Sequence, residues 1–180
     1  MARLKEYKPY RFYTFVQLRF LGLYKEHIMP HCYQSIVVNA PVDKVWDTIK
    51  NFHDMSWAAS VIEKCEAVGE KSGTEAGAKR ILNNAFHETL LECNDQEHRV
   101  RYSIDDGPSP VSSAEVSHYI GNLHLIPVTL NNSTFVEWGS NWESVSEDAA
   151  EFLPSNLCGF IERIGSTIRH KLMLVRVCAA

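Results

Sequence analysis

The sequence lacks the motifs that identify most nucleotide-dependent, hydrolytic and zinc-dependent enzymes. It contains no glycine-rich phosphate-binding loop, and no serine lies in a nucleophile elbow. Its five cysteines are odd in number and share no metal-ligand spacing. His118 and His124 share one face of a predicted strand, but six residues at ~3.3 Å each separate them by ~20 Å, too far to share a metal. We therefore expect neither a metal nor a cofactor.

The body of the chain also has little positive charge. Residues 29–180 contain twelve Lys or Arg against twenty Asp or Glu, a balance of −8, whereas residues 1–28 contain six against two, a balance of +4. An acidic body argues against a nucleic-acid-binding surface there. Cys65 and Cys93 fall in predicted strands and Cys158 in a predicted helix, so we expect buried free thiols in a reducing, cytoplasmic compartment.

The N-terminal stretch has no unbroken apolar run. Residues 1–28 hold seven aromatic residues, but Gln17 and Arg19 interrupt them, so this is neither a signal peptide nor a membrane span. Three interpretations are open: a basic amphipathic helix in weak contact with a membrane or a partner, a cover for an exposed sheet face, or non-native sequence with Met29 as the true start. We expect the domain to span residues 29–180, with a disordered or non-native extension before it whose deletion leaves the fold intact.

A long amphipathic helix is predicted near the C-terminus, over residues 154–176. Pro154 suits its first turn, where a missing N–H costs nothing. Its apolar positions recur with a helical period and form one stripe: Leu157, Phe160, Ile161, Ile164, Ile168, Leu172 and Val175. The stripe is either ordinary core or one wall of a cavity closed against a curved sheet.

Nearly everything before that helix predicts β-structure. The predicted strands cover residues 33–39, 61–68, 78–82, 85–93, 99–105, 116–126 and 135–144. A helix is predicted over residues 42–50, and a short helix or turn over residues 51–60. Asn83 and Asn84, which tolerate positive φ, predict a tight hairpin. One strand, two short helices, about six antiparallel strands and a long helix make an α+β domain.

Residues 39–46 (NAPVDKVW) open a series of short motifs. The others follow in order at Phe52, Trp57, 77–80, 88–90, 101–104, 107–111, Tyr119, 127–128 and 135–138. Over residues 33–175 the set resembles the START-like (SRPBCC) helix-grip superfamily, in its polyketide cyclase/dehydrase-like branch. That superfamily includes the birch pollen allergen and the plant abscisic acid receptors.

The resemblance implies a seven-stranded antiparallel sheet wrapped around the long C-terminal helix, with two short helices after the first strand and a cavity between sheet and helix. By similarity to the hormone receptors, Glu88 faces this cavity, and Arg80 and Tyr102 are natural partners for its carboxylate. The ligand-binding residues that the resemblance implies are Trp57, Arg80, Leu82, Glu88, Tyr102, Ile104, Val111, Tyr119, Leu123, Glu137, Leu157, Ile161 and Ile164.

Two features of the sequence bear on how completely side chains fill this implied interior. Gly121 on the sheet and Gly165 on the helix are small, so we expect the interior to be unevenly packed and to leave room for a ligand. Glu137 has the opposite strand parity to Trp138 and Trp142. If Glu137 faces inward, the tryptophans face outward, under the N-terminal segment.

The sequence departs from the hormone receptors at their ligand anchor. The position of their lysine, which holds the ligand's carboxylate, is Glu63, and their mobile gate is reduced to residues 82–85. The stretch of residues 112–118 is longer than usual. An anionic ligand of the abscisic acid type is therefore disfavoured.

Three functions remain open for this sequence. The first is the binding of a small hydrophobic or amphipathic molecule, such as a lipid or polyketide, by a carrier or sensor. The second is a cyclase- or dehydratase-like enzyme in which Glu88, Glu137 and Tyr102 are the acid–base candidates. The third is a protein-interaction module with a filled core. The sequence predicts no particular oligomeric state.

Overall fold

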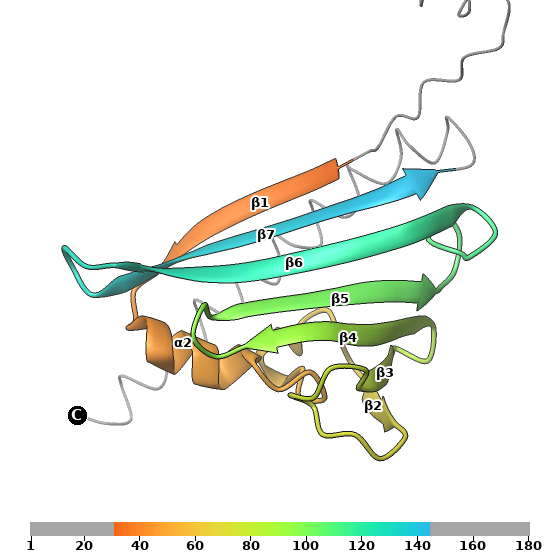
Figure 1. The fold of residues 1–180 in the computed structure, drawn as a ribbon, viewed down its shortest axis with the longest axis horizontal. Helices are drawn as coiled ribbons and strands as arrows, with labels where there is room; N and C mark the ends of the chain where they lie inside the picture. The colour runs from red at the N-terminus through yellow and green to blue at the C-terminus, as the bar shows by residue number, and fades with distance from the viewer. Residues whose placement is uncertain (1–30, 145–180) are drawn as a thin grey trace, which may run out of the picture.

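The computed structural model describes residues 31–144, which form one antiparallel sheet of seven strands with helical turns against it (Figure 1). The strands are β1 (His31–Val38), β2 (Cys65–Val68), β3 (Lys79–Leu82), β4 (Phe86–Asn94), β5 (Arg99–Asp106), β6 (Val116–Val128) and β7 (Ser133–Ser144). Their order across the sheet is β1-β7-β6-β5-β4-β3-β2. The predicted α+β class and seven-stranded antiparallel sheet are confirmed.

Several predictions concern residues outside this range. The long helix over residues 154–176, and with it Leu157, Ile161, Ile164 and Gly165, lies outside the described residues. So do residues 1–28. The placement of these side chains against the sheet stays a prediction.

Helix α2 (Val42–Ile49) follows β1, as its sequence pattern predicts. Val45, Trp46 and Ile49 are buried on one face, and Pro41 precedes the first turn. The second predicted helix is instead a single 3-10 turn, η1 (Ser56–Ala58), with Trp57 buried. The aperiodic stretch of residues 51–60 favours neither a longer helix nor a strand, so one turn is enough to bury its apolar residues.

The β3–β4 hairpin turns where the paired asparagines predict it. Asn83 and Asn84 have φ angles of 51° and 56°, the left-handed region that asparagine adopts at low cost. The Asn83 side chain also accepts hydrogen bonds from the backbone N–H groups of Glu63 and Lys64, at 2.9 and 3.1 Å. These bonds fix the start of β2 against the hairpin.

Strand β6 continues through Pro127, where the sequence predicts its end. Leu125 donates its backbone N–H to the His98 carbonyl, just outside β5. Two residues later an N–H would point the same way, past the end of β5, so the missing N–H of Pro127 removes no ladder bond. Pro127 pairs with Thr134 of β7 on the other side.

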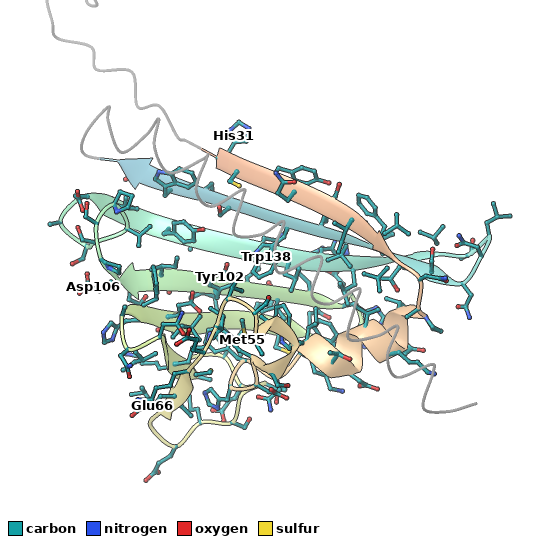
Figure 2. All side chains as sticks on the ribbon, turned by 180° about the vertical axis from the view of Figure 1, so that it is seen from behind. His31, Met55, Glu66, Tyr102, Asp106 and Trp138 are labelled. Carbon is teal, nitrogen blue, oxygen red and sulfur yellow. The ribbon has the colours of Figure 1, made fainter. Side chains whose placement is uncertain are left out.

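The two faces of the sheet differ in what covers them. We call the inner face the one that Phe52 and Trp57 contact, and the outer face its opposite. The ring of Phe52 lies 6.3 Å from that of Tyr102, and the ring of Trp57 lies 6.1 Å from that of Trp138. Figure 2 shows Tyr102 and Trp138 on this side of the sheet, with the Met55 segment beside them. Side chains alternate between the faces, so each strand contributes every second residue to the inner one.

The cysteines depart in part from the expected free thiols. Cys65 and Cys93 are free and partly exposed. Cys32, buried on β1, is disulfide-bonded, and its partner lies outside the described residues. The expectation of free thiols throughout is therefore wrong for Cys32.

Candidate functional site

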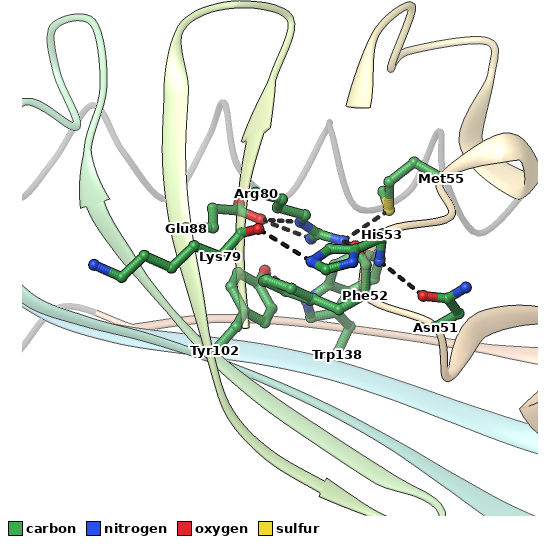
Figure 3. Close-up of polar contacts among 9 residues, drawn as sticks. All are labelled: Asn51, Phe52, His53, Met55, Lys79, Arg80, Glu88, Tyr102 and Trp138. Carbon is green, nitrogen blue, oxygen red and sulfur yellow. Dashed lines mark hydrogen bonds and ion pairs between the residues drawn. The ribbon is translucent and has the colours of Figure 1, made fainter. Parts of the chain in front are cut away.

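A buried ion pair lies on the inner face, between neighbouring strands. Arg80 of β3 and Glu88 of β4 are directly opposed in the strand register. Their side chains are each 7 % exposed, and Arg80 Nη2 lies 2.6 Å from Glu88 Oε2. Arg80 Nε donates to the same oxygen at 2.7 Å (Figure 3). The predicted pairing of these residues is confirmed.

The Arg80 guanidinium is held from several sides. Its Nη1 donates to the Phe52 carbonyl at 2.7 Å and contacts the Met55 sulfur at 3.1 Å. The guanidinium carbon lies 3.7 Å from the centre of the Phe52 ring, a cation–π contact. The segment between α2 and η1 therefore fixes Arg80, and Arg80 in turn fixes Glu88.

The two carboxylate oxygens of Glu88 are used unequally. Both Arg80 donors bind Oε2, and Oε1 receives no hydrogen bond from any residue of the described part of the chain. Burial raises the pKa of Glu88, while the adjacent Arg80 charge opposes the rise. The result is a rigid, buried carboxylate with one acceptor oxygen left over.

Tyr102 lies beside the pair, on β5. Burial raises its pKa well above the ordinary value, and the nearby Tyr119 and Glu88 reinforce the rise. Its hydroxyl oxygen accepts a hydrogen bond from Trp138 Nε1 at 3.1 Å, so the phenolic proton remains available for donation. The ring occupies the space over Gly121, where an added Cβ would lie 2.2 Å from its Cζ. Gly121 therefore makes room for Tyr102 and not for a ligand, contrary to the prediction.

A second aromatic group lies toward the far end of β6 and β7. Tyr119 and Trp142 stack with ring centres 5.8 Å apart. Burial raises the pKa of Tyr119, and the neighbouring Ser140 hydroxyl opposes this without reaching hydrogen-bond geometry. The buried polar atoms without a hydrogen-bond partner, among the described residues, are Trp57 Nε1, Trp142 Nε1 and Ser140 Oγ.

Glu137 is on the other face of the sheet, and its predicted inward orientation is wrong. Its Oε1 lies 3.0 Å from His124 Nδ1, and Tyr33 Oη donates to its Oε2 at 3.2 Å. Trp138 and Trp142 are buried at 6 % and 0 % exposed, so the tryptophans face inward in its place. Burying two large indoles is favourable, whereas burying one carboxylate is costly, and strand alternation allows only one of the two arrangements.

Most of the other described residues of the predicted set are buried. Arg80, Glu88 and Tyr102 come together on the inner face, and Glu137 is excluded. Leu82, Val111, Tyr119, Leu123 and Trp57 are buried, and Ile104 is partly buried. Phe52, Met55 and Trp138 were not predicted, although strand parity would have indicated Trp138 had Glu137 been placed outside.

A groove of about 280 Å³ lies at the β2–β5 end of the sheet, and no sequence feature predicts it. It is lined by Val68, Lys79, Arg80, Ile81, His87, Glu88, Asp105 and Asp106. Asp105 accepts hydrogen bonds from the hydroxyls of Thr89 and Ser103, and Asp106 accepts one from the Ser113 backbone. The groove's aspartates are therefore already engaged by the chain itself.

Residues 31–144 contain no group of three or more His, Cys, Asp or Glu side chains placed to hold a metal ion. No helix there is long and apolar enough to cross a membrane.

Solved structures with the same fold include both close and distant relatives. A protein from Nitrosospira multiformis is 47 % identical, with a TM-score of 0.71 over 77 % of this chain and 96 % of its own. A major latex-like protein from Panax ginseng is 14 % identical, with a TM-score of 0.67 over 80 % of this chain and 97 % of its own. Norcoclaurine synthase from Thalictrum flavum, solved with a transition-state analogue, is 12 % identical, with a TM-score of 0.65 over 83 % and 97 %. The last two share the fold alone.

No curated protein matches the chain. The model of the family described as "polyketide cyclase / dehydrase and lipid transport" matches residues 29–163. This match spans most of the chain and includes the whole described sheet, with the Arg80–Glu88 pair on its inner face. The chain belongs to this polyketide cyclase / dehydrase and lipid transport family, within the START-like helix-grip superfamily.

Proposed function

We propose that the chain binds a small, neutral, amphipathic molecule against the inner face of the sheet, with a hydrogen-bond donor of the ligand on Glu88. The observation that carries this proposal is the unoccupied Oε1 of a carboxylate that is otherwise buried and fixed. A ligand hydroxyl that donates to this oxygen forms a hydrogen bond to a charged group, which is worth ~1.5–3 kcal/mol.

The charges around the site favour a neutral ligand over an anion. Glu88 is itself negative, and each of the three guanidinium nitrogens of Arg80 already has a partner. Nε and Nη2 bind Glu88, and Nη1 binds Phe52 and Met55. An anionic ligand would meet an engaged guanidinium and a repelling carboxylate. A hydroxyl or amine meets an acceptor already in place.

The rest of the inner face supplies apolar surface for the body of the ligand. Leu90, Leu123, Tyr102 and Trp138 are buried there, on neighbouring strands. Apolar walls with a few fixed polar groups are typical of small-molecule sites. Family membership supports the same reading, because its description covers both polyketide chemistry and lipid transport.

The test compares two near-isosteric probes by titration calorimetry. We expect 2-naphthol, which has a donor, to bind wild-type protein about tenfold more tightly than 2-methoxynaphthalene, which has none. In Arg80→Met/Glu88→Leu the preference should vanish while the fold survives, because replacing a whole buried ion pair with apolar residues is often neutral. Glu137→Gln, on the outer face, is the matched control. Equal affinities of the two probes for wild-type protein would contradict the role of Glu88.

A second candidate function, acid–base catalysis, is favoured by one observation. Glu88 has an unoccupied acceptor oxygen, and Tyr102 keeps a phenolic proton to donate because Trp138 donates to its oxygen. Glu88 would take a proton from a carbon next to a carbonyl, and Tyr102 would stabilise the resulting enolate by hydrogen bonding. Such a pair would serve a cyclase- or dehydratase-like reaction on a polyketide-like substrate.

The two functions differ in what Tyr102→Phe does. A catalyst of proton exchange on a carbonyl compound should lose at least about tenfold in rate with little change in binding. A carrier should bind equally well and show no exchange in either form. Deuterium exchange into 2-acetylnaphthalene, followed by mass spectrometry, measures the rate of this proton exchange directly. Exchange no faster than in buffer alone would contradict a catalytic function.

A further inference from the structure

We infer that the chain forms a two-fold symmetric dimer, in which β1 pairs edge to edge and antiparallel with β1 of a second copy. The inference concerns the edge of the sheet and is independent of any ligand on its inner face. Three observations carry it: the open edge of β1, the contrast between the two edge strands, and one register that matches the exposed side chains of β1.

The first observation is the open edge of β1. This strand is first in the order of the sheet, so it pairs with β7 on one side and, among residues 31–144, with no strand on the other (Figure 1). It is eight residues long, and its pairing with β7 runs without a bulge from His31 to Val38. An edge of this kind presents a row of backbone N–H and C=O groups with which a further strand can pair.

The sequence of β1 has none of the usual protection against such pairing. Proteins commonly protect an edge strand with charged side chains, prolines, bulges or a short length. The strand reads HCYQSIVV, with no Lys, Arg, Asp, Glu or Pro, and it ends in three β-branched residues. Its outer face exposes Tyr33 by 52 % and Val37 by 49 %. These are the features of a strand that accepts a neighbour.

The opposite edge of the sheet is protected. Strand β2 has only four residues, and Glu66 within it lies 2.9 Å from Lys64 in an exposed ion pair. Of the two edges, β1 is therefore the one suited to association. Pairing of β1 with β1 also closes on itself as a dimer, whereas pairing of β1 with β2 of another copy would continue into a filament.

One antiparallel register fits the side chains of β1 to themselves. With the two-fold axis at Ser35, Tyr33 of each copy lies opposite the partner's Val37, and Gln34 lies opposite the partner's Ile36. Paired residues then have the same parity, so the outer faces of the two sheets are continuous. A pair of an aromatic and a β-branched residue is among the favourable cross-strand pairs, and no charged side chain of β1 meets another.

This register also extends an apolar row that already crosses three strands. Val37 of β1 and Ile126 of β6 are both paired with Phe135 of β7, and Ile126 is 37 % exposed. In the dimer, the partner's Tyr33 lies next to Val37 and adds a fourth strand to the row. Removing these exposed apolar side chains from water favours association.

The acidic body of the chain does not oppose this contact. Glu137 lies opposite Ser35 in the β1–β7 register, so the two copies of Glu137 are three strand spacings apart, ~14 Å at ~4.8 Å each. That distance exceeds the Debye length of ~8 Å at physiological salt. Each Glu137 is also hydrogen-bonded within its own copy, to Tyr33 and to His124.

The chain's own N-terminal residues are the other candidate partner for this edge. To pair with β1 they would need a tight hairpin directly before His31. Residues 27–30 (HIMP) contain no Gly, Asn or Asp, the residues that the turns of such hairpins favour. Pairing with a second copy needs no turn.

The experiment measures the mass of the full chain by sedimentation velocity, from about 1 to about 300 μM. We expect the mass to rise with concentration from 20.5 kDa toward twice that value, with a dissociation constant on the order of 10 μM, as for a small interface. Ser35→Lys should raise this constant at least about tenfold, because like charges meet at the two-fold axis. Within one copy, the introduced charge lies opposite Glu137, so the fold should survive.

Ser117→Lys is the matched control. Ser117 also lies opposite a glutamate, Glu143, but on β6 in the interior of the sheet. This variant gains the same charge next to the same type of partner, away from the edge of β1. It should dimerise like wild-type protein.

Cross-linking tests the register in a Cys65→Ser/Cys93→Ser background, which removes the two partly exposed thiols. Ser35→Cys should form a covalent dimer with the oxidant diamide, because directly opposed residues on neighbouring strands have Cα atoms ~5 Å apart, within the reach of a disulfide. Val37→Cys is the control on the same face. Its two copies would be offset by four residues, ~13 Å, and should not cross-link.

The outcomes decide between a dimer, another interface and no association. A full chain that stays at 20.5 kDa throughout, or one that grows beyond the dimer, would overturn the closed β1 pair. So would a dimer that is as stable in Ser35→Lys as in wild-type protein, or equal cross-linking through Val37→Cys. Should Ser35→Lys fail to fold, the two cysteine variants decide. None of these results changes the evidence for a ligand, so the proposed function is tested separately.

Discussion

Two glutamates on opposite faces of one sheet show how differently the same side chain is used. The Glu88 side chain is 7 % exposed and is bound by Arg80, whereas that of Glu137 is 28 % exposed and is hydrogen-bonded to His124 and Tyr33. Water still screens Glu137 and its partners, so their mutual attraction is worth little. Glu88 has exchanged water for one cation, so each member of that pair depends on the other.

The difference indicates that the inner face of the sheet, and not the outer face, is the better candidate for ligand binding. An exposed cluster such as Glu137–His124–Tyr33 needs no ligand to explain it, because solvent completes its hydrogen bonds. The inner face holds a carboxylate oxygen and two indole nitrogens without partners among the described residues. The two indole nitrogens are buried as well, and a buried donor is costly unless something binds it.

Removing the main partner of each glutamate should give the largest difference in stability between the two faces. Arg80→Met leaves a buried carboxylate without its partner, so we expect a loss of ~3–5 kcal/mol in the free energy of unfolding. His124→Gln, which removes the partner of Glu137, should cost less than ~1 kcal/mol. Urea denaturation measures both, and losses of equal size would show that the inner pair is as solvated as the outer one.

Two glycines make a matched pair for packing. An added Cβ at Gly121, on the inner face, would meet the Tyr102 ring at 2.2 Å, whereas one at Gly139, on the outer face, would lie 3.4 Å from the nearest atom. We expect Gly121→Ala to cost ~1–3 kcal/mol by displacing the ring and Gly139→Ala to cost well under that. If both substitutions are neutral in thermal unfolding, Tyr102 is not held where the structure has it.

Much of this arrangement follows from the sequence, and its gaps have physical causes. The Asn83–Asn84 turn, the α2 face of Val45, Trp46 and Ile49, and the Arg80–Glu88 pair all depend on local conformation or strand parity. Such short-range rules can be applied along one chain.

The face of β7 could not be predicted in the same way. Alternation offers two complementary sets of residues, and the choice between Glu137 and Trp138 depends on which strands lie beside them. The contact of the Met55 segment with Arg80 likewise joins residues 25 apart through a loop without a periodic pattern. Cross-strand and loop contacts of this kind are set by the tertiary structure.

Alkaline pH should test the burial of the two tyrosines on the inner face. Burial raises the pKa of Tyr102 and of Tyr119, so above a pH of about 10 the unfolded chain ionises them while the folded chain does not. Their stabilising contribution is complete below this pH and falls above it, by up to ~1.4 kcal/mol per pH unit for each tyrosine.

Urea unfolding across this range measures the slope. We expect Tyr119→Phe to make this slope shallower, because it removes one of the two buried phenols. A slope that does not respond to Tyr119→Phe would mean that this phenol ionises in the folded chain.

The smallest effect is expected from deletion of residues 1–28. The family match begins at residue 29 and β1 begins at His31, so we propose that the domain folds without the extension. The melting temperature should change by less than about 2 °C, corresponding to under ~0.5 kcal/mol. A large fall in melting temperature or solubility would indicate instead that the segment packs on the sheet, where the exposed Tyr33 and Val37 lie.

Native mass spectrometry of protein purified from its own cells tests the central claim most directly. The account predicts a co-purified neutral small molecule, retained in Glu137→Gln and lost in Arg80→Met/Glu88→Leu. A folded protein that carries no such molecule and binds none of the probes, or an adduct that survives equally in both variants, would contradict the claim that the inner face around Glu88 is the binding site.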